Sequence, residues 1–272
     1  MDFVKMHGLG NDFIIIDDMA NAFDITPEYA RALCDRRTGI GADGVMLARP
    51  SDRADSFMLL YNSDGSVAEM CGNGIRCFAK FLYESGVAKK RTIPIDTPAG
   101  IKLAELTLQN DAVTGIRIDM GAPRFDRRDI PAEGEGEFHL QTIQAGGRSF
   151  LCSALNTGVP HLVVFEDGLT EEEICRYGPL LETHPLFPAK INVNFARILP
   201  DRTLSVRTWE RGCGRTLACG TGSCACAAAA AKAGYTHRQT VVRLPLGELM
   251  IQWTDDSIFM TGPAEFSFRG SI

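Results

Sequence analysis

The sequence has no long run of basic residues, no apolar segment of membrane length and no low-complexity tract. Its longest basic run is Lys89-Lys90-Arg91, and the formal net charge is −6. Because nucleic-acid phosphates are bound by clustered positive charge, this charge pattern disfavours a nucleic-acid partner. The longest apolar run, residues 225–231, is rich in alanine and is too short to cross a bilayer. We therefore expect no membrane partner either.

The sequence also lacks an export signal and a Cys-x-x-Cys pair. The N-terminus has no basic segment followed by an apolar core, and the nine cysteines include no pair at the spacing typical of zinc or redox modules. Disulfide frameworks belong to small exported chains, and this chain of 272 residues is neither small nor visibly exported. We expect a cytoplasmic protein whose thiols are reduced.

An internal repeat is the main feature that the sequence does contain. At a shift of 148 positions, the separation between Cys71 and Cys219, the motif Cys-Gly-Asn-Gly lies over Cys-Gly-Thr-Gly. The same shift aligns other separated segments, among them residues 14–16 with residues 162–164. Because these segments agree at one shift, the sequence predicts two copies of one folded unit.

Strand-like segments that end in turn residues mark the points where the chain crosses from one copy to the other. These segments lie near residues 118 and 262. We predict a first domain of residues 1–118 plus 263–272 and a second domain of residues 119–262. If a pseudo-twofold axis relates the copies, the active site lies in the cleft between these domains.

Within each copy, the residue pattern predicts short strands and one central helix. Runs of β-branched or aromatic residues predict strands at 13–17, 45–49, 57–61, 93–96 and 101–106. After Cys71 the apolar residues recur with the period of a helix that Gly86 ends, and an alanine-rich helix after Cys219 ends at Gly234. An alanine helix has no bulky face, which suits enclosure by a sheet. We predict an α+β fold in which each repeat is a curved mixed β-sheet wrapped around a central helix.

Each Cys-Gly-x-Gly motif stands at the start of a predicted helix. A helix N-terminus presents backbone N–H groups without intrahelical partners and a partial positive charge, so a thiol there is expected to have a lowered pKa. The glycines leave the neighbouring amides open to a carboxylate. The duplicated motif predicts that Cys71 and Cys219 lie on opposite faces of one carboxylate-bearing carbon. Inversion of an α-carbon needs this arrangement, because one face loses a proton while the other gains one.

The motifs around these cysteines resemble those of the diaminopimelate epimerase family. The matching segments are His-Gly-Leu-Gly-Asn-Asp-Phe at 7–13, Gly-Ile-Gly-Ala-Asp at 39–43, Asn-Ser-Asp-Gly-Ser at 62–66, Met-Cys-Gly-Asn-Gly-Ile-Arg-Cys at 70–77, Trp-Glu-Arg-Gly at 209–212 and Ala-Cys-Gly-Thr-Gly-Ser-Cys-Ala at 218–225. The resemblance implies conversion of LL-2,6-diaminopimelate to the meso form in lysine biosynthesis, without pyridoxal phosphate or metal. It also implies a small-molecule substrate and a homodimer.

The resemblance assigns roles to individual residues. Cys71 and Cys219 match the catalytic pair, and His161 and Glu210 match residues thought to tune the two thiols. The residues that would bind the substrate, through backbone amides or side chains, are Asn11, Asn62, Gly72, Asn73, Asn192, Glu210, Arg211, Gly220 and Thr221.

Two positions depart from the family pattern. Gly44 stands where the family often has Gln, and Val159 stands where it has a substrate-binding Asn. We predict that Asn156, three residues before Val159, replaces this Asn. Because both departures concern the distal end of the substrate, the reaction type is better defined than the substrate.

Three alternative functions compete with this interpretation. Residues 39–44 fit the dinucleotide-binding fingerprint, but a helix predicted at 29–37 precedes them and a strand follows, which reverses the required order. The changes at Gly44 and Val159 leave open a related cofactor-independent racemase of another L-amino acid, although Asn73 argues against proline racemases, which carry His there. A protein that binds a carboxylate without catalysis is the third alternative.

Overall fold

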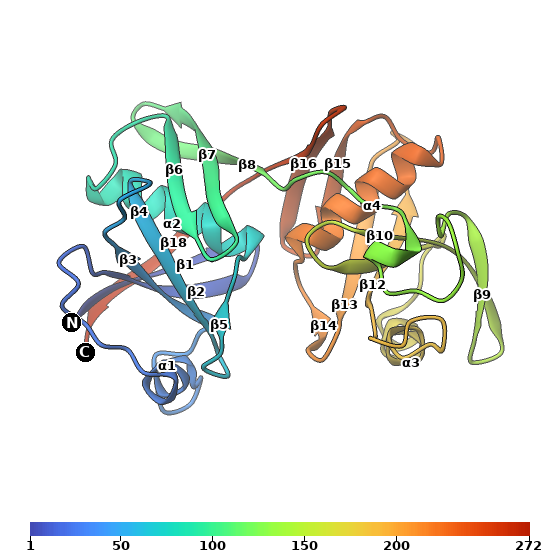
Figure 1. Ribbon diagram of the computed structural model, residues 1–272, viewed down its shortest axis with the longest axis horizontal. Coiled ribbons are helices and arrows are strands. Elements are labelled where there is room, and N and C mark those ends of the chain that lie inside the picture. The colour runs from blue at the N-terminus through green and yellow to red at the C-terminus, as the bar shows by residue number, and fades with distance from the viewer. The chain divides into compact units, whose positions relative to one another are not determined.

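The computed structural model describes residues 1–272, and the chain divides into two compact units (Figure 1). The first unit consists of Met1–Asp119 with Thr261–Ile272, and the second of Met120–Met260. None of the helices combines the length and the hydrophobicity of a membrane-spanning segment.

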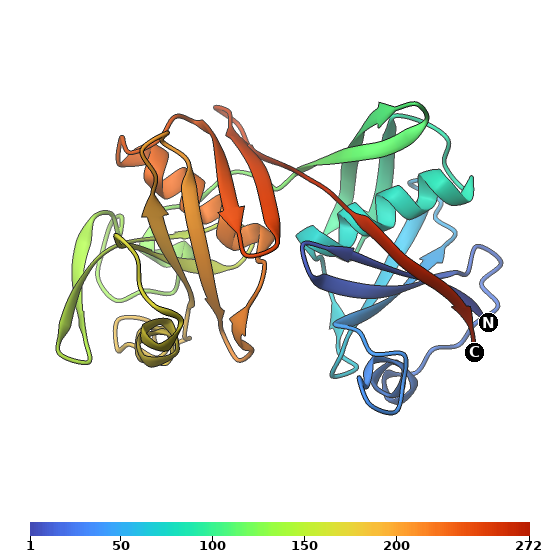
Figure 2. The same ribbon diagram turned by 180° about the vertical axis from the view of Figure 1, so that it is seen from behind.

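The first unit is a mixed sheet whose strands follow the order β18-β1-β2-β3-β4-β6-β7-β8, with the short β5 beside β4. The β2–β3 and β4–β6 pairs are parallel, and the other pairs are antiparallel. Figure 2 shows the C-terminal strand β18 lying along the N-terminal strand β1. The strands are β1 (Asp2–Gly8), β2 (Asn11–Asp17), β3 (Gly44–Arg49), β4 (Ser56–Asn62), β5 (Val67–Ala68), β6 (Thr92–Thr97), β7 (Gly100–Gln109), β8 (Ala112–Asp119) and β18 (Glu265–Ser271).

Two helices pack on this sheet. Helix α2 (Gly72–Ser85) contacts β1, β2, β3, β7 and β8, and therefore lies at the centre of the unit, whereas α1 (Pro27–Cys34) contacts β3 and β4. The prediction of a helix at 29–37 is wrong at the C-terminal end, because α1 ends at Cys34. Asp35 stops α1, because its carboxylate accepts the backbone N–H groups of Arg37 and Thr38 (2.8 and 2.7 Å) and holds the chain in a turn.

The second unit repeats this arrangement with β9 at the edge, in the order β9-β10-β11-β12-β13-β15-β16-β17, with β14 beside β13. The strands are β9 (Gln141–Ala145), β10 (Arg148–Asn156), β11 (Pro160–Phe165), β12 (Asn192–Ile198), β13 (Leu204–Glu210), β14 (Gly214–Thr216), β15 (Gln239–Leu244), β16 (Gly247–Trp253) and β17 (Ile258–Gly262). The helices are the short 3-10 turn η1 (Arg127–Asp129), α3 (Glu171–Glu182) and α4 (Gly220–Lys232).

The two sheets share their strand register as well as their order. In the parallel pair β2–β3, Phe13 lies opposite Gly44, and in the parallel pair β11–β12, His161 lies opposite Asn192. Both pairs are related by the shift found in the sequence. The duplicated α+β fold, with a curved mixed sheet around a central helix, is therefore confirmed.

The alanine-rich helix α4 is enclosed as its composition predicts. It contacts six strands of its sheet, β10, β11, β12, β13, β15 and β16, and residues 225–230 are buried. Small side chains allow this close approach, because a bulky residue on any face would meet a strand. The helix ends at Lys232, and Gly234 follows with φ 76° in the left-handed region.

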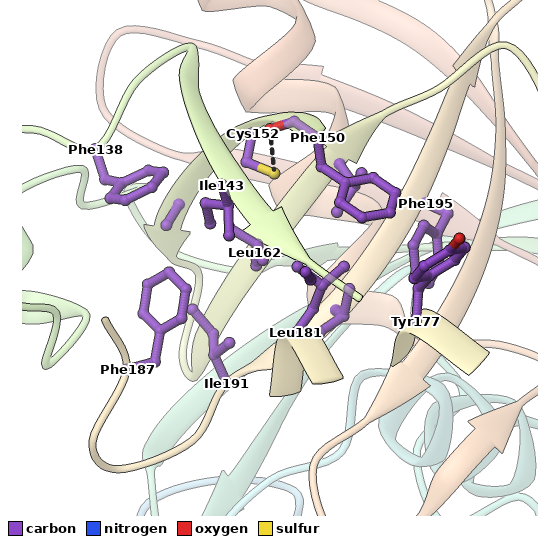
Figure 3. Close-up of a cluster of buried hydrophobic side chains, with 14 of the residues drawn as sticks. Phe138, Ile143, Phe150, Cys152, Leu162, Tyr177, Leu181, Phe187, Ile191 and Phe195 are labelled. Carbon is purple, nitrogen blue, oxygen red and sulfur yellow. Dashed lines mark hydrogen bonds between the residues drawn. The ribbon is translucent and has the colours of Figure 1, made fainter. Parts of the chain in front are cut away.

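The other face of the second sheet packs against α3 through an aromatic core (Figure 3). The rings of Phe150 and Tyr177 meet edge to face, with centroids 5.1 Å apart. Leu181 of α3 is fully buried in this cluster, whereas its neighbour Leu180 is 42% exposed. Trp209 packs against the same cluster and can report its unfolding.

We expect Leu181→Ala to lower the free energy of unfolding of the second unit by about 2–5 kcal/mol, because it leaves a cavity in a close-packed core. The matched variant Leu180→Ala is expected to lower it by about 1 kcal/mol at most, because that side chain is half exposed. Urea unfolding followed by tryptophan fluorescence measures both. Equal effects at the two positions would contradict the described core.

Candidate active site

Cys71 occupies the N-cap of α2. Its backbone is extended, and its Sγ accepts the backbone N–H of Gly74 at 3.4 Å. Its thiol also donates to Oδ1 of Asn11 at 3.6 Å. A Cβ at position 74 would lie 2.5 Å from Cε of Met46, so the small size of Gly74 lets the start of the helix pack closely on β3. The motif therefore fixes a half-buried thiol at the start of the helix.

The orientation of Asn11 is fixed by hydrogen bonds on both sides of its amide. Its Nδ2 donates to Asp43 (2.7 Å), and its Oδ1 accepts from Nδ2 of Asn73 (3.2 Å). The Asn73 amide is fixed in turn by Arg76, whose Nη2 donates to its Oδ1 (3.1 Å). The Asn11 oxygen therefore faces Cys71. The sequence reasoning missed Asp43 and Arg76, although both lie within motifs that it quoted.

Cys219 occupies the N-cap of α4 with the same geometry. Its Sγ accepts the backbone N–H of Gly222 at 3.4 Å and lies 3.4 Å from Oγ1 of Thr221. The side chain is buried. The two cysteines predicted to start the two helices therefore do so with equivalent hydrogen bonds from the third residue of each helix.

The pKa of Cys219 is raised well above its ordinary value. Burial is the largest cause, and the nearby Glu210 carboxylate adds to it, whereas hydrogen bonds from Thr221 and Gly222 act in the opposite direction. The expectation that the helix start lowers this pKa is wrong, because loss of hydration disfavours the thiolate more than the helix terminus favours it. Cys219 is therefore a protonated thiol at neutral pH.

His161 is fully buried on β11, behind the first turn of α4. Its Nε2 lies 2.9 Å from Oγ1 of Thr221, and its Nδ1 lies 3.0 Å from Nδ2 of Asn194. Burial, with a smaller contribution from the charge of Arg211, lowers its pKa to about 3. The imidazole is therefore neutral at physiological pH, and its contact with the thiol runs through Thr221.

Of the other predicted polar residues of the second unit, Asn192 and Arg211 bond to the backbone, and Glu210 bonds to a side chain. Asn192 donates to the carbonyl of Pro160 (2.9 Å) and accepts the N–H of Arg211 (3.0 Å). Glu210 accepts from the hydroxyl of Thr216 at 2.6 Å. The Arg211 side chain is exposed, with Nη1 donating to a backbone carbonyl.

In the first unit, Asn62 is exposed and donates to Ser66. Roles for these residues in substrate binding stay predictions.

One of the two departures from the family pattern, Gly44, has a local structural explanation. A Cβ at Gly44 would lie 2.6 Å from the carbonyl oxygen of Tyr61, so close strand packing requires glycine there. Asn156 donates to the carbonyl of Asp129 (2.7 Å) and accepts the N–H of Gly158 (2.9 Å). These contacts fix the loop before β11. Val159 is 38% exposed on that loop.

No group of three or more His, Cys, Asp or Glu side chains is placed to hold a metal ion. Five buried cysteines, Cys34, Cys77, Cys152, Cys224 and Cys226, lie away from the helix starts. Burial raises the pKa of Cys34 to about 11 and that of Cys77 to about 12. Burial likewise raises the pKa values of Cys152 and Cys226. These thiols are packing groups.

The model of one protein family, diaminopimelate epimerase, matches residues 3–125 and 153–267. The chain belongs to the diaminopimelate epimerase family. A diaminopimelate epimerase of Desulforudis audaxviator is 47% identical over 274 residues, covering 99% of this chain and 98% of its own length. One from Desulfitobacterium hafniense is 44% identical over 277 residues, covering 100% and 98%.

Solved structures of lower sequence identity share the fold of the diaminopimelate epimerase family. A hydroxyproline epimerase from Agrobacterium vitis superposes with a TM-score of 0.73 at 17% identity, covering 99% of this chain and 91% of its own. A probable proline racemase from Agrobacterium radiobacter superposes with a TM-score of 0.71 at 18% identity, covering 100% and 92%. At this identity the likeness concerns the fold alone.

We expect Glu210→Gln to lower the pKa of Cys219, because removing a negative charge favours the thiolate. The pH of half-maximal alkylation of Cys219 by iodoacetamide, followed by mass spectrometry of its peptide, should move down by about one pH unit. The exposed Glu248→Gln on β16 is the control and should leave this midpoint unchanged. An unchanged or higher midpoint in Glu210→Gln would show that Glu210 does not act on this thiol.

Proposed function

We propose that this chain interconverts LL-2,6-diaminopimelate and meso-2,6-diaminopimelate by moving protons between Cys71, Cys219 and opposite faces of one α-carbon. One observation supports this above all others: both thiols are N-caps of equivalent helices in a duplicated fold. Membership of the diaminopimelate epimerase family identifies the substrate class and the place in lysine biosynthesis.

The helix starts supply a binding site for the carboxylate next to the reacting carbon. The first backbone N–H groups of an α-helix have no partner within the helix and lie at its positive end. In the proposed complex, the amides of Gly72, Asn73, Gly220 and Thr221 hold the carboxylate. As the α-proton leaves, negative charge moves into this carboxylate, so the same amides stabilise the transition state.

The reaction needs one thiolate and one thiol. The thiolate takes the α-proton and becomes S–H, the electron pair of the broken C–H bond spreads into the carboxylate, and the opposing thiol delivers its proton to the other face. The raised pKa of Cys219 keeps this residue protonated, so it supplies the proton donor in one direction. In the reverse direction the two sulfur atoms exchange roles, and the net proton count is unchanged.

The distal amino-acid end of the substrate is assigned to the polar side chains Asn11, Asn62, Asn192 and Arg211, with Asn156 in place of the family Asn missing at position 159. Of these, Asn62 and Arg211 are exposed, and charged or amide side chains there can bind the zwitterionic end of the substrate. A cytoplasmic homodimer completes the proposal.

A racemase of another L-amino acid is the second candidate, favoured by the exposed Val159 at the position of a family Asn. Gly44 does not favour it, because strand packing accounts for that residue. The same experiment tests both candidates. Only the epimerase acts on LL-diaminopimelate in preference to a panel of other L-amino acids.

We expect the wild-type chain in deuterated water to incorporate deuterium at the α-carbon of LL-diaminopimelate while forming the meso isomer, as NMR measures. Cys71→Ser and Cys219→Ser should each lower the rate of epimerisation by at least about a thousandfold, because each turnover needs a proton donor or acceptor on both faces.

The exposed Cys175→Ser is the control and should retain wild-type activity. Epimerisation at the wild-type rate in either active-site variant would contradict the two-thiol scheme. Tight binding of LL-diaminopimelate without any deuterium incorporation in the wild type would identify a binding protein instead.

A further inference from the structure

The two units share one scaffold beneath their N-cap thiols but line it with different side chains. In the first unit this lining is apolar and buried, and it consists of Phe13, Met46 and Leu60. A Cβ on Gly74 would lie 2.5 Å from Met46 and 3.4 Å from Phe13, and Met46 pairs with Leu60 across the β3–β4 ladder.

The second unit places polar side chains at the same three positions of the repeat. His161 corresponds to Phe13, Asn194 to Met46 and Thr208 to Leu60. Asn194 pairs with Thr208 across the β12–β13 ladder, in the register of the first unit. All three polar side chains are buried, so their hydrogen bonds must be made within the protein.

These side chains form a hydrogen-bonded chain whose direction is fixed at Asn194. Its Nδ2 donates to the carbonyl of Leu162 (3.4 Å) and faces Nδ1 of His161 (3.0 Å), while its Oδ1 accepts from Thr208 (3.1 Å). A backbone carbonyl only accepts, so the nitrogen of the amide must face Leu162 and His161. Nδ1 of His161 is therefore an acceptor.

An acceptor at Nδ1 places the proton of the neutral imidazole on Nε2. Nε2–H then donates to Oγ1 of Thr221 at 2.9 Å. Because Thr221 already accepts this bond, its own hydrogen is directed to Sγ of Cys219, 3.4 Å away. Each member of the chain thus determines the direction of the next hydrogen bond.

We propose that Asn194 is a positioning residue that fixes the proton of His161 on Nε2, so that the hydroxyl of Thr221 donates to the sulfur of Cys219. This series of hydrogen bonds, from Asn194 through His161 and Thr221 to Cys219, is called the relay below, and it exists in one repeat only. In the other repeat, Cys71 meets the acceptor oxygen of Asn11. The two thiols are therefore unequal: the Thr221 hydroxyl donates to the sulfur of Cys219 and offsets part of the rise in its pKa, whereas Cys71 donates its own hydrogen to the Asn11 oxygen.

The charged groups around the relay shift the pKa values of Cys219 and His161. Glu210 on β13 disfavours the thiolate of Cys219, and the Thr221 hydroxyl opposes this effect. Arg211, next to Glu210, helps to keep His161 uncharged. The relay rests on the proposed function, because it matters for catalysis only if Cys219 moves protons.

The tautomer of His161 is directly measurable in the full chain labelled with 15N-histidine. Long-range 1H–15N NMR spectra distinguish a ring protonated on Nε2 from one protonated on Nδ1, and the signals of His161 are those missing in His161→Gln. The relay predicts the Nε2–H tautomer from pH 5 to pH 9. A ring protonated on Nδ1, or a charged ring at pH 6, would overturn it.

Variants test whether the orientation of the hydrogen bonds set at Asn194 determines the hydrogen bond at the sulfur of Cys219. Asn194→Asp replaces the donor to Nδ1 with an acceptor, so it should move the proton of His161 to Nδ1 and turn the Thr221 hydroxyl away from Cys219. The alkylation midpoint of Cys219 should then rise by about one pH unit, the effect of losing a hydrogen bond to a charged group. Thr221→Val should raise it equally, and Thr221→Ser should not.

The double variant Asn194→Asp/Thr221→Val separates a relay from two independent effects. Residues that act through one another give non-additive shifts, so the double variant should match Thr221→Val alone. Additive shifts would contradict the relay. Should Asn194→Asp fail to fold, the triple variant His161→Phe/Asn194→Met/Thr208→Leu copies the lining that the first unit already packs.

The triple variant should fold and should also raise the alkylation midpoint of Cys219. An unchanged midpoint would overturn the relay. All these readouts use the substrate-free protein, so they are independent of the epimerase assay. The predicted tautomer without deuterium exchange would refute only the proposed function, whereas deuterium exchange with the wrong tautomer would refute only the relay.

Discussion

The N-cap position of a helix is the constraint on which both halves of this molecule depend. A cysteine there places its sulfur within reach of the third amide of the helix, 3.4 Å away in each unit. The residue that supplies this amide is glycine in both units, and the side chain of a sheet residue, Met46 or Asn194, occupies the space that a Cβ would take. The sheet, the helix and the reactive group are thus fixed by one short motif.

Duplication of this motif gives two thiols with the same backbone geometry and different surroundings. Burial and a nearby carboxylate outweigh the helix terminus at Cys219, so position at a helix start does not by itself set the protonation state. A two-base reaction benefits from unequal partners, because one sulfur must hold the proton that the other lacks. At Cys219 burial and the Glu210 carboxylate favour the protonated thiol and the proposed relay opposes them, whereas the lining under Cys71 is apolar.

The sequence predicts the backbone better than it predicts the polarity of the site. Period and repeat predict the central helices and most strands of the first unit, because burial of apolar side chains leaves a regular pattern. The end of α1 was missed because a single Asp35 side chain decides it. The sequence does not predict the roles of Asn194 and Thr208, because these roles depend on the direction of their hydrogen bonds. A comparison of the repeats position by position does show the difference, because Asn194 aligns with Met46 and Thr208 aligns with Leu60.

The most direct test of the proposed two-thiol site is mild oxidation of the substrate-free enzyme followed by mapping of its disulfides. If Cys71 and Cys219 face one substrate carbon, a disulfide should join them, epimerase activity should disappear and reductant should restore it. Recovery of both thiols as separately alkylated peptides, under conditions that oxidise the enzyme, would contradict this account.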